Sequence, residues 1–169
     1  MISAKPFLKW AGGKGQLIAS IKKSLPEDFS ERKELCYIEP FVGSGAILFW
    51  ILDNFAHIKT AVINDINTDL IDAYRVVKKN PAGLIRLLKE LQHEYYSLKT
   101  NNGRKSFYLE KRREFNLRSS NKLVSSGLLI FLNRTCYNGL YRVNSRNEFN
   151  VPFGDYSKPG ICDAETICS

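Results

Sequence analysis

The stretch Cys36–Gly45, with the sequence CYIEPFVGSG, predicts a strand, a turn and the start of a helix. An apolar segment ends at Glu39, a proline bend follows, and Gly43 and Gly45 flank Ser44 before an apolar run. Glycine permits positive φ and close approach of the backbone to a ligand, and serine is a favourable helix N-cap. This order is typical of the first half of a nucleotide-binding βαβ unit, although an ordinary tight turn is the alternative interpretation.

A second strand is predicted at 60–63, and it ends in Asn64-Asp65-Ile66-Asn67. Asp65 lies about 20 residues beyond the glycine turn, where an acidic side chain can hold both hydroxyls of a ribose. Capping of the next helix is the alternative role for Asp65, but Asn67 can supply that cap for a helix over 69–78. We therefore expect Asp65 to be free for a ligand.

Upstream of the first strand lies the segment 7–14, FLKWAGGK, and a helical pattern then runs to Pro26. The backbone N–H groups of the Gly12-Gly13 turn, with Lys14 beside them, suit a carboxylate or a phosphate. A solvated turn is the alternative. The segment is not a P-loop, because the spaced glycines and the Lys-Ser/Thr pair are missing.

Length and composition indicate one folded domain with a basic surface. The chain has 169 residues, a net charge of +8 and a pI near 9.4, which favours a polyanionic partner such as nucleic acid over a merely basic protein. Four cysteines without a Cys-x-x-Cys pair, and only two histidines, indicate neither a zinc site nor a disulfide framework. Free thiols suit a reducing cytoplasm, and the absence of a long apolar run argues against a membrane span.

The second half of the chain predicts helices and then a hairpin. Leucines at helical spacing begin after Pro81, and Asn101-Asn102-Gly103 is expected to separate this helix from a charged one that ends near Arg118. The run 111–113, KRR, is either a solvated helix face or a contact surface. The apolar segment 123–132 predicts a buried helix.

Residues 133–152 predict a loop and a β-hairpin that turns at 145–147. The segment carries Arg134, Arg142 and Arg146, together with Tyr137 and several asparagines. Arginine and asparagine pair with guanine and adenine edges, and tyrosine stacks where a base has left. A basic surface without base contacts is the alternative.

Four blocks in order resemble the Dam-like (D12 class) family of site-specific DNA adenine-N6 methyltransferases. They are FLKWAGGK at 7–14, EPFVGSG at 39–45, NDIN at 64–67, and 133–154 with YNGL and EFNVPFG. The resemblance implies an α/β, Rossmann-like methyltransferase fold that uses S-adenosylmethionine, with a helical and β-hairpin target-recognition region. We expect the cofactor-binding part at 1–80, the recognition region at 81–160, and the start of a return to the catalytic domain at 161–169.

The resemblance also assigns roles. Trp10 and Lys14 would hold the cofactor, with its methionine end near the Gly-Gly turn, and Asp65 would take the ribose hydroxyls. The expected cofactor residues are Trp10, Gly12, Gly13, Lys14, Glu39, Pro40, Gly43, Gly45 and Asp65. No metal is expected to take part.

On duplex DNA, Arg142 would read a base, Tyr137 would fill the gap left by the flipped adenine, Asn138 would contact a phosphate, and Lys9 would approach a guanine. The expected DNA residues are Lys9, Arg134, Tyr137, Asn138, Arg142, Asn144, Pro152 and Tyr156. By similarity the target is GATC, and its adenine must be flipped to reach the cofactor methyl group.

The family's adenine-gripping Asp-Pro-Pro-Tyr motif has no counterpart here, since the chain contains no adjacent prolines. We therefore assign no catalytic residue and expect an N-terminal methyltransferase portion with an incomplete parallel sheet, inactive alone. Two alternatives stay open: a non-catalytic DNA- or cofactor-binding remnant, and half of a split enzyme completed by a chain that carries the missing strands. The expected location is the cytoplasm, at the nucleoid.

Overall fold

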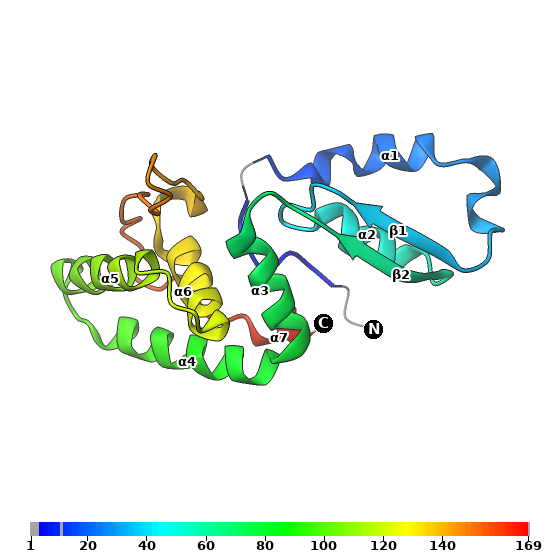
Figure 1. The fold of residues 1–169 in the computed structure, drawn as a ribbon. Coiled ribbons are helices and arrows are strands. Elements are labelled where there is room, and N and C mark those ends of the chain that lie inside the picture. Colours follow the sequence, from blue (N-terminus) through cyan, green and yellow to red (C-terminus); the bar gives the residue numbers. More distant parts are fainter. Residues whose placement is uncertain (1–3, 11, 169) are drawn as a thin grey trace.

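The computed structural model describes residues 4–10 and 12–168, so Ala11 of the N-terminal motif lies outside the described residues. In chain order its elements are η1 (Lys14–Leu17), α1 (Ile18–Ser24), η2 (Glu27–Ser30), β1 (Leu35–Glu39), α2 (Ala46–Asn54), β2 (Ile58–Ile63), α3 (Thr68–Lys79), α4 (Pro81–Ser97), α5 (Asn101–Asn116), α6 (Lys122–Thr135), η3 (Tyr137–Gly139) and α7 (Ala164–Cys168). Figure 1 shows two regions. The sheet region runs from η1 to β2, and the helical region comprises α3 to α7, with α3 between the two strands and the remaining helices.

The predicted strands pair in parallel. Ile38 lies opposite Val62 and Glu39 opposite Ile63, so both strands end at the same edge. The predicted helix after the glycine turn also forms, but Gly45 is its N-cap and Ser44 is not. Gly45 has φ +78°, and a Cβ there would lie 2.5 Å from the Tyr74 hydroxyl, so only glycine fits this position. The Ser44 cap was therefore a wrong prediction.

Side-chain caps fix the starts of the four long helices. Asn67 accepts from the Leu70 N–H, Asn80 from Gly83, Thr100 from Gly103, and Asn121 from Leu123 and Val124. The cap predicted at Asn67 is confirmed. The predicted break at 101–103 is wrong, because Thr100 caps α5 and residues 101–103 form its first turn.

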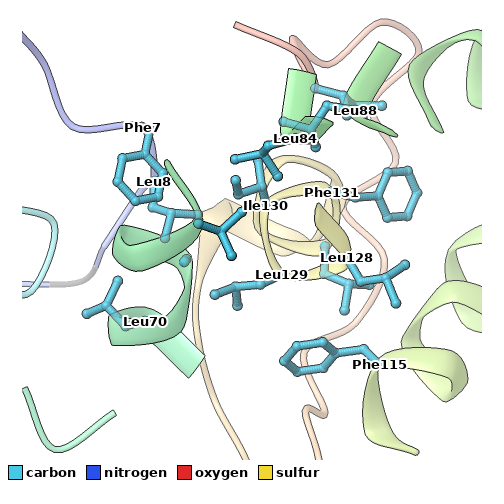
Figure 2. Close-up of a cluster of buried hydrophobic side chains, with 14 of the residues drawn as sticks. Phe7, Leu8, Leu70, Leu84, Leu88, Phe115, Leu128, Leu129, Ile130 and Phe131 are labelled. Carbon is cyan, nitrogen blue, oxygen red and sulfur yellow. The ribbon is translucent and has the colours of Figure 1, made fainter. Parts of the chain in front are cut away.

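Most of the hydrophobic core lies in the helical region, where Figure 2 shows side chains of α3, α4 and α5 and the N-terminal residues Phe7 and Leu8 gathered around α6. α6 supplies consecutive buried residues from Ser126 to Asn133, which confirms the predicted buried helix. Leu84, Leu88 and Phe131 are each 0% exposed. Since α3 is part of this core, the predicted boundary at residue 80 falls between two helices of one packed unit.

The predicted hairpin is incomplete. Among the described residues it forms isolated antiparallel bridges, Cys136 with Phe153 and Val143 with Phe149, and no continuous strand. α6 runs to Thr135, so Asn133 and Arg134 are helical and not in a loop as predicted. The turn is closed by backbone hydrogen bonds, from the Asn144 N–H to the Glu148 carbonyl and from the Asn147 N–H to the Asn144 carbonyl. The Asn144 side chain adds to them by accepting the N–H groups of Arg146 and Glu148.

The sheet region is more open than the helical region. Ile38 is 63% and Val62 48% exposed, although they face each other across the two strands. Among the described residues of η1, α1 and η2, none is buried. The observed fold is thus a mixed helix and strand structure with a two-stranded parallel sheet. In the described part of the chain, no helix combines the length and apolar character needed to cross a membrane.

Candidate cofactor and nucleic-acid site

Backbone hydrogen bonds join the two strand ends into one loop cluster. The Asn64 N–H donates to the Glu39 carbonyl and the Val42 N–H to the Asn64 carbonyl, each at 2.9 Å. These bonds continue the parallel pairing past the strands. They place the glycine turn directly beside Asp65, although 22 residues of sequence separate Gly43 from Asp65.

Asp65 has backbone partners on both carboxylate oxygens. Its Oδ2 accepts from the Gly43 N–H at 2.9 Å and its Oδ1 from the Asn67 N–H at 3.0 Å. Since Asn67 caps α3, Asp65 does not serve as the helix cap, and these two N–H groups fix its carboxylate in place. Each carboxylate oxygen can accept more than one hydrogen bond, so Asp65 is held in place and keeps acceptor capacity.

A cavity of about 200 Å³ lies over the glycine turn. Of the nine expected cofactor residues, seven line it, namely Trp10, Gly12, Gly13, Lys14, Glu39, Gly43 and Asp65. Pro40 lines a neighbouring apolar cavity of about 520 Å³ instead. Gly45 lines neither and is buried under Tyr74 and Phe49. Glycine is therefore required at position 45 for packing beneath the turn, and Gly45 does not line the cavity.

Opposite charges meet inside this cavity. The Lys14 ammonium lies 3.5 Å from Glu39 Oε1 and donates to the Phe41 carbonyl. Glu39 is only 5% exposed, and its other oxygen accepts a 2.8 Å hydrogen bond from the Tyr37 hydroxyl. Burial and the nearby Glu39 charge raise the Tyr37 pKa well above its ordinary value, so this phenol stays a neutral donor. The cavity thus offers one cation and two carboxylates, Glu39 and Asp65.

Sequence reasoning missed the aromatic support of the cavity. The Trp10 ring stacks on Tyr141, with centroids 5.2 Å apart and planes at 26°. Tyr141 comes from the segment after α6, far along the chain from Trp10. The one signal available was the aromatic residue inside the Leu-Tyr-Arg sequence at 140–142, which pattern reasoning treated as part of a strand.

Several expected DNA residues gather on one side of the loop after α6. A Cβ at Gly139 would lie 2.5 Å from the Lys9 side chain, so Lys9 crosses the η3 turn that carries Tyr137 and Asn138. The Lys9 ammonium lies 5.8 Å from the centre of the Tyr156 ring, and the Tyr137 N–H donates to the Pro152 carbonyl at 2.9 Å. The Tyr137 side chain is exposed. Lys9, Tyr137, Asn138, Pro152 and Tyr156 therefore form one surface cluster, which we name the Lys9 cluster.

The remaining three expected DNA residues differ in exposure. Arg142 is exposed, and its guanidinium binds both the side-chain and backbone oxygens of Asn150. Asn144 closes the turn and donates to Glu148. Arg134 is turned inward to the Phe7 carbonyl at 2.9 Å, and burial lowers the pKa of its guanidinium. Arg134 is thus placed as a link between α6 and the N-terminal segment.

The buried side chain of Asn133 links Lys9 to Gly139 through hydrogen bonds, and sequence reasoning gave it no role. Its amide accepts from the Lys9 N–H and donates to the carbonyls of Lys9 and Gly139, each at 2.8 Å. It is 2% exposed in a helix of apolar residues. A polar residue near the end of an otherwise apolar helix was the available signal, because buried amides require partners.

Across residues 4–10 and 12–168, no group of three or more His, Cys, Asp or Glu side chains lies close enough to hold a metal ion.

Comparison with known proteins identifies the family. The family model described as "D12 class N6 adenine-specific DNA methyltransferase" matches residues 10–167. The chain is 45% identical over 168 residues to "Type II methyltransferase M.MjaIII" of Methanocaldococcus jannaschii, an alignment that covers 98% of this chain and 57% of that protein. It is 42% identical over 152 residues to the "DNA adenine methylase" of Haemophilus influenzae, covering 90% and 48% respectively.

A third relative also matches nearly the whole of this chain and about half of its own length. "Type II methyltransferase M1.LlaDCHI" of Lactococcus lactis is 38% identical over 169 residues, covering 98% of this chain and 53% of that protein. The chain therefore spans about half the length of the curated relatives it matches. The family match includes both strand ends, the glycine turn and the segment after α6. The chain belongs to the family of D12 class N6 adenine-specific DNA methyltransferases.

Proposed function

We propose that this chain supplies the cofactor-binding and target-recognition parts of an enzyme that methylates the N6 of adenine in duplex DNA, at GATC. The observation that carries the proposal is the pairing of two features on adjacent surfaces. One is the cavity between Glu39, Lys14 and Asp65, and the other is the Lys9 cluster beside it, joined to the cavity through Lys9-Trp10.

The side chains of the cavity fit S-adenosylmethionine by their chemistry. The cofactor carries a carboxylate, an ammonium group and a ribose diol, and the cavity presents Lys14, Glu39 and the acceptor oxygens of Asp65. Lys14 with the Gly12-Gly13 turn would hold the carboxylate, Glu39 the ammonium group, and Asp65 the diol. At about 200 Å³ the cavity is smaller than typical ligand sites of about 300–1,000 Å³, so it would enclose part of the cofactor.

When bound, S-adenosylmethionine supplies an electrophilic methyl group on a sulfonium. This chain's residues would bind and orient: Arg142 reads a base edge, and Tyr137 occupies the space that the flipped adenine leaves. The Asp-Pro-Pro-Tyr motif expected to grip that adenine is not among the 169 residues. We therefore propose that the chain by itself binds cofactor and DNA without transferring methyl groups. Since the substrate is genomic DNA, we place the protein at the nucleoid.

Cofactor binding is tested with S-adenosylhomocysteine by isothermal titration calorimetry. Asp65→Asn and Glu39→Gln are expected to weaken binding about tenfold or more, because each loses a charged acceptor at about 1.5–3 kcal/mol. Glu90→Gln, at an exposed position on α4, is the matched control and should bind as the unmodified chain does. If Asp65→Asn and Glu39→Gln bind S-adenosylhomocysteine as tightly as the control Glu90→Gln, the cofactor assignment is contradicted.

DNA recognition is tested by fluorescence anisotropy with duplexes that contain GATC or a scrambled site. Arg142→Ala should weaken binding to the GATC duplex by about 1–3 kcal/mol and reduce its preference over the scrambled duplex. Arg86→Ala removes the same charge from an exposed position on α4 and should leave the preference intact. Identical affinity for both duplexes in the unmodified chain contradicts the GATC assignment.

A further inference from the structure

Tyr141 forms the outer support of the cavity wall. Trp10 lies against the glycine turn, since a Cβ at Gly43 would come within 3.5 Å of the indole. The same ring stacks on Tyr141. Trp10 therefore contacts both the glycine turn and Tyr141.

Tyr141 is itself fixed at its hydroxyl and at its ring. The hydroxyl donates to Asp69 Oδ2 at 2.8 Å, and the ring packs edge-on against Phe149 at 5.8 Å. Burial and the Asp69 charge raise the Tyr141 pKa to about 12. The phenol is therefore a neutral donor over the physiological pH range.

Asp69 also binds the turn of the loop after α6. Its Oδ2 pairs with the Arg118 guanidinium at 2.5 Å, and the other terminal nitrogen of Arg118 donates to the Asn147 carbonyl. Arg118 lies over the Phe115 ring and has a left-handed backbone, φ +56°, where α5 ends. One carboxylate oxygen of Asp69 thus serves both the cavity wall and the turn at 145–147.

We propose that Tyr141 is a positioning residue that holds Trp10 against the glycine turn and, through Asp69 and Arg118, couples cofactor binding to the position of the loop 142–147. The coupling rests on the proposed function of the two sites. DNA that holds the loop in this position keeps Asn147 bonded to Arg118, Arg118 to Asp69 and Asp69 to the Tyr141 hydroxyl, and so keeps Trp10 in place for the cofactor. Because linkage is reciprocal, cofactor binding raises the affinity for DNA by the same factor.

The first test needs no ligand. In a Trp50→Phe background the remaining tryptophan fluorescence reports Trp10 alone. Tyr141→Leu removes the stacking ring and should red-shift the emission and raise acrylamide quenching, whereas Tyr141→Phe keeps the ring and should resemble the parent. Emission and quenching unchanged in Tyr141→Leu overturn the positioning role.

The second test measures S-adenosylhomocysteine affinity with and without saturating GATC duplex. In the parent chain, DNA should tighten cofactor binding about fivefold or more, the lower range of allosteric coupling. Without DNA, Tyr141→Phe should bind S-adenosylhomocysteine nearly as tightly as the parent does. With DNA, it should lose most of the fivefold gain in affinity. Tyr96→Phe removes a hydroxyl that donates to the Pro159 carbonyl, outside the network, and should keep the factor.

The outcomes separate the inference from the function on which it rests. The coupling is overturned if DNA tightens cofactor binding in Tyr141→Phe as much as in the parent. It is also overturned if the parent binds both ligands and neither changes the affinity of the other. In both cases the proposed function still stands. A parent chain that binds no S-adenosylhomocysteine overturns the proposed function and the coupling together. The quenching measurement then still decides whether Tyr141 positions Trp10.

Discussion

The two regions of the molecule differ in how they are stabilised. The helical region encloses a core of fully buried side chains, and side chains cap the starts of its four long helices. The sheet region has two strands, an exposed apolar pair at Ile38 and Val62, and a helix after the glycine turn whose N-cap makes no side-chain bond. Yet most expected cofactor residues lie in the sheet region. The comparison teaches that the loop at the strand ends is held by specific hydrogen bonds together with the burial of Val42, although the strands beside it are open.

The largest expected effect tests the packing difference. Phe131→Ala in the helical region removes a ring that is 0% exposed and should lower the free energy of unfolding by about 3–5 kcal/mol. Ile38→Ala in the sheet region, at a 63% exposed position, should change it by about 0.5 kcal/mol or less. Urea denaturation followed by circular dichroism measures both. Similar losses in the two variants would show that the sheet region is as tightly packed as the helical region.

The next effect tests the junction between the regions. Asn133→Ala leaves the Lys9 N–H and the carbonyls of Lys9 and Gly139 without their buried partner, at a cost of about 2–3 kcal/mol in unfolding free energy. Asn54→Ala, which loses one exposed bond to the Trp50 carbonyl, is the control and should cost little. The same urea titration compares them. A small loss in Asn133→Ala means that other groups replace the amide and that Asn133 does not organise the site.

A smaller difference is expected between two glycines with similar backbones, Gly12 just before the sheet region and Gly45 inside it. Gly45 and Gly12 have φ of +78° and +75°, but a Cβ at Gly45 would lie 2.5 Å from the Tyr74 hydroxyl, whereas a Cβ at Gly12 meets nothing within 4 Å. Both alanine variants carry the left-handed strain of about 1–2 kcal/mol, and Gly45→Ala adds overpacking of about 1–3 kcal/mol. In thermal unfolding, Gly45→Ala should therefore have a lower melting temperature than Gly12→Ala. Equal melting temperatures would mean that the sheet region yields easily around the turn.

The last effect is a pH dependence at the contact between the regions. Tyr141 titrates at 10.0 in its ordinary state and at about 12 in the fold, because burial beside Asp69 favours the neutral phenol. Its contribution to stability is complete below pH 10 and is lost as the pH rises from about 10 to about 12. The difference in unfolding free energy between the unmodified chain and Tyr141→Phe should therefore shrink over this window. A constant difference across the window would show that the phenol is not held neutral by the fold.

Pattern reasoning predicted both strands, the helix cap at Asn67 and the buried helix α6, since these depend on local periodicity and on capping chemistry. Its predictions were wrong where one local sequence pattern is compatible with two different structures. Asn101–Gly103 resembles a break but begins a helix, because Thr100 supplies the cap. The segment 133–152 resembles a hairpin, but α6 extends to Thr135 and the antiparallel pairing after it is limited to isolated bridges. Arg134, an expected DNA contact, donates to the Phe7 carbonyl, and its contact with DNA stays a prediction.

The sequence by itself determined the family and the residues that meet over the glycine turn, because the parallel strands at 35–39 and 58–63 must end at one edge of the sheet. Only the tertiary structure decided how these residues are held. Three contacts join positions far apart in the chain: the pairing of Asp65 with the Gly43 N–H, the stacking of Tyr141 on Trp10, and the bridge from Asn133 to Lys9. Such contacts depend on distance in space and direction of side chains, which periodicity and composition do not encode.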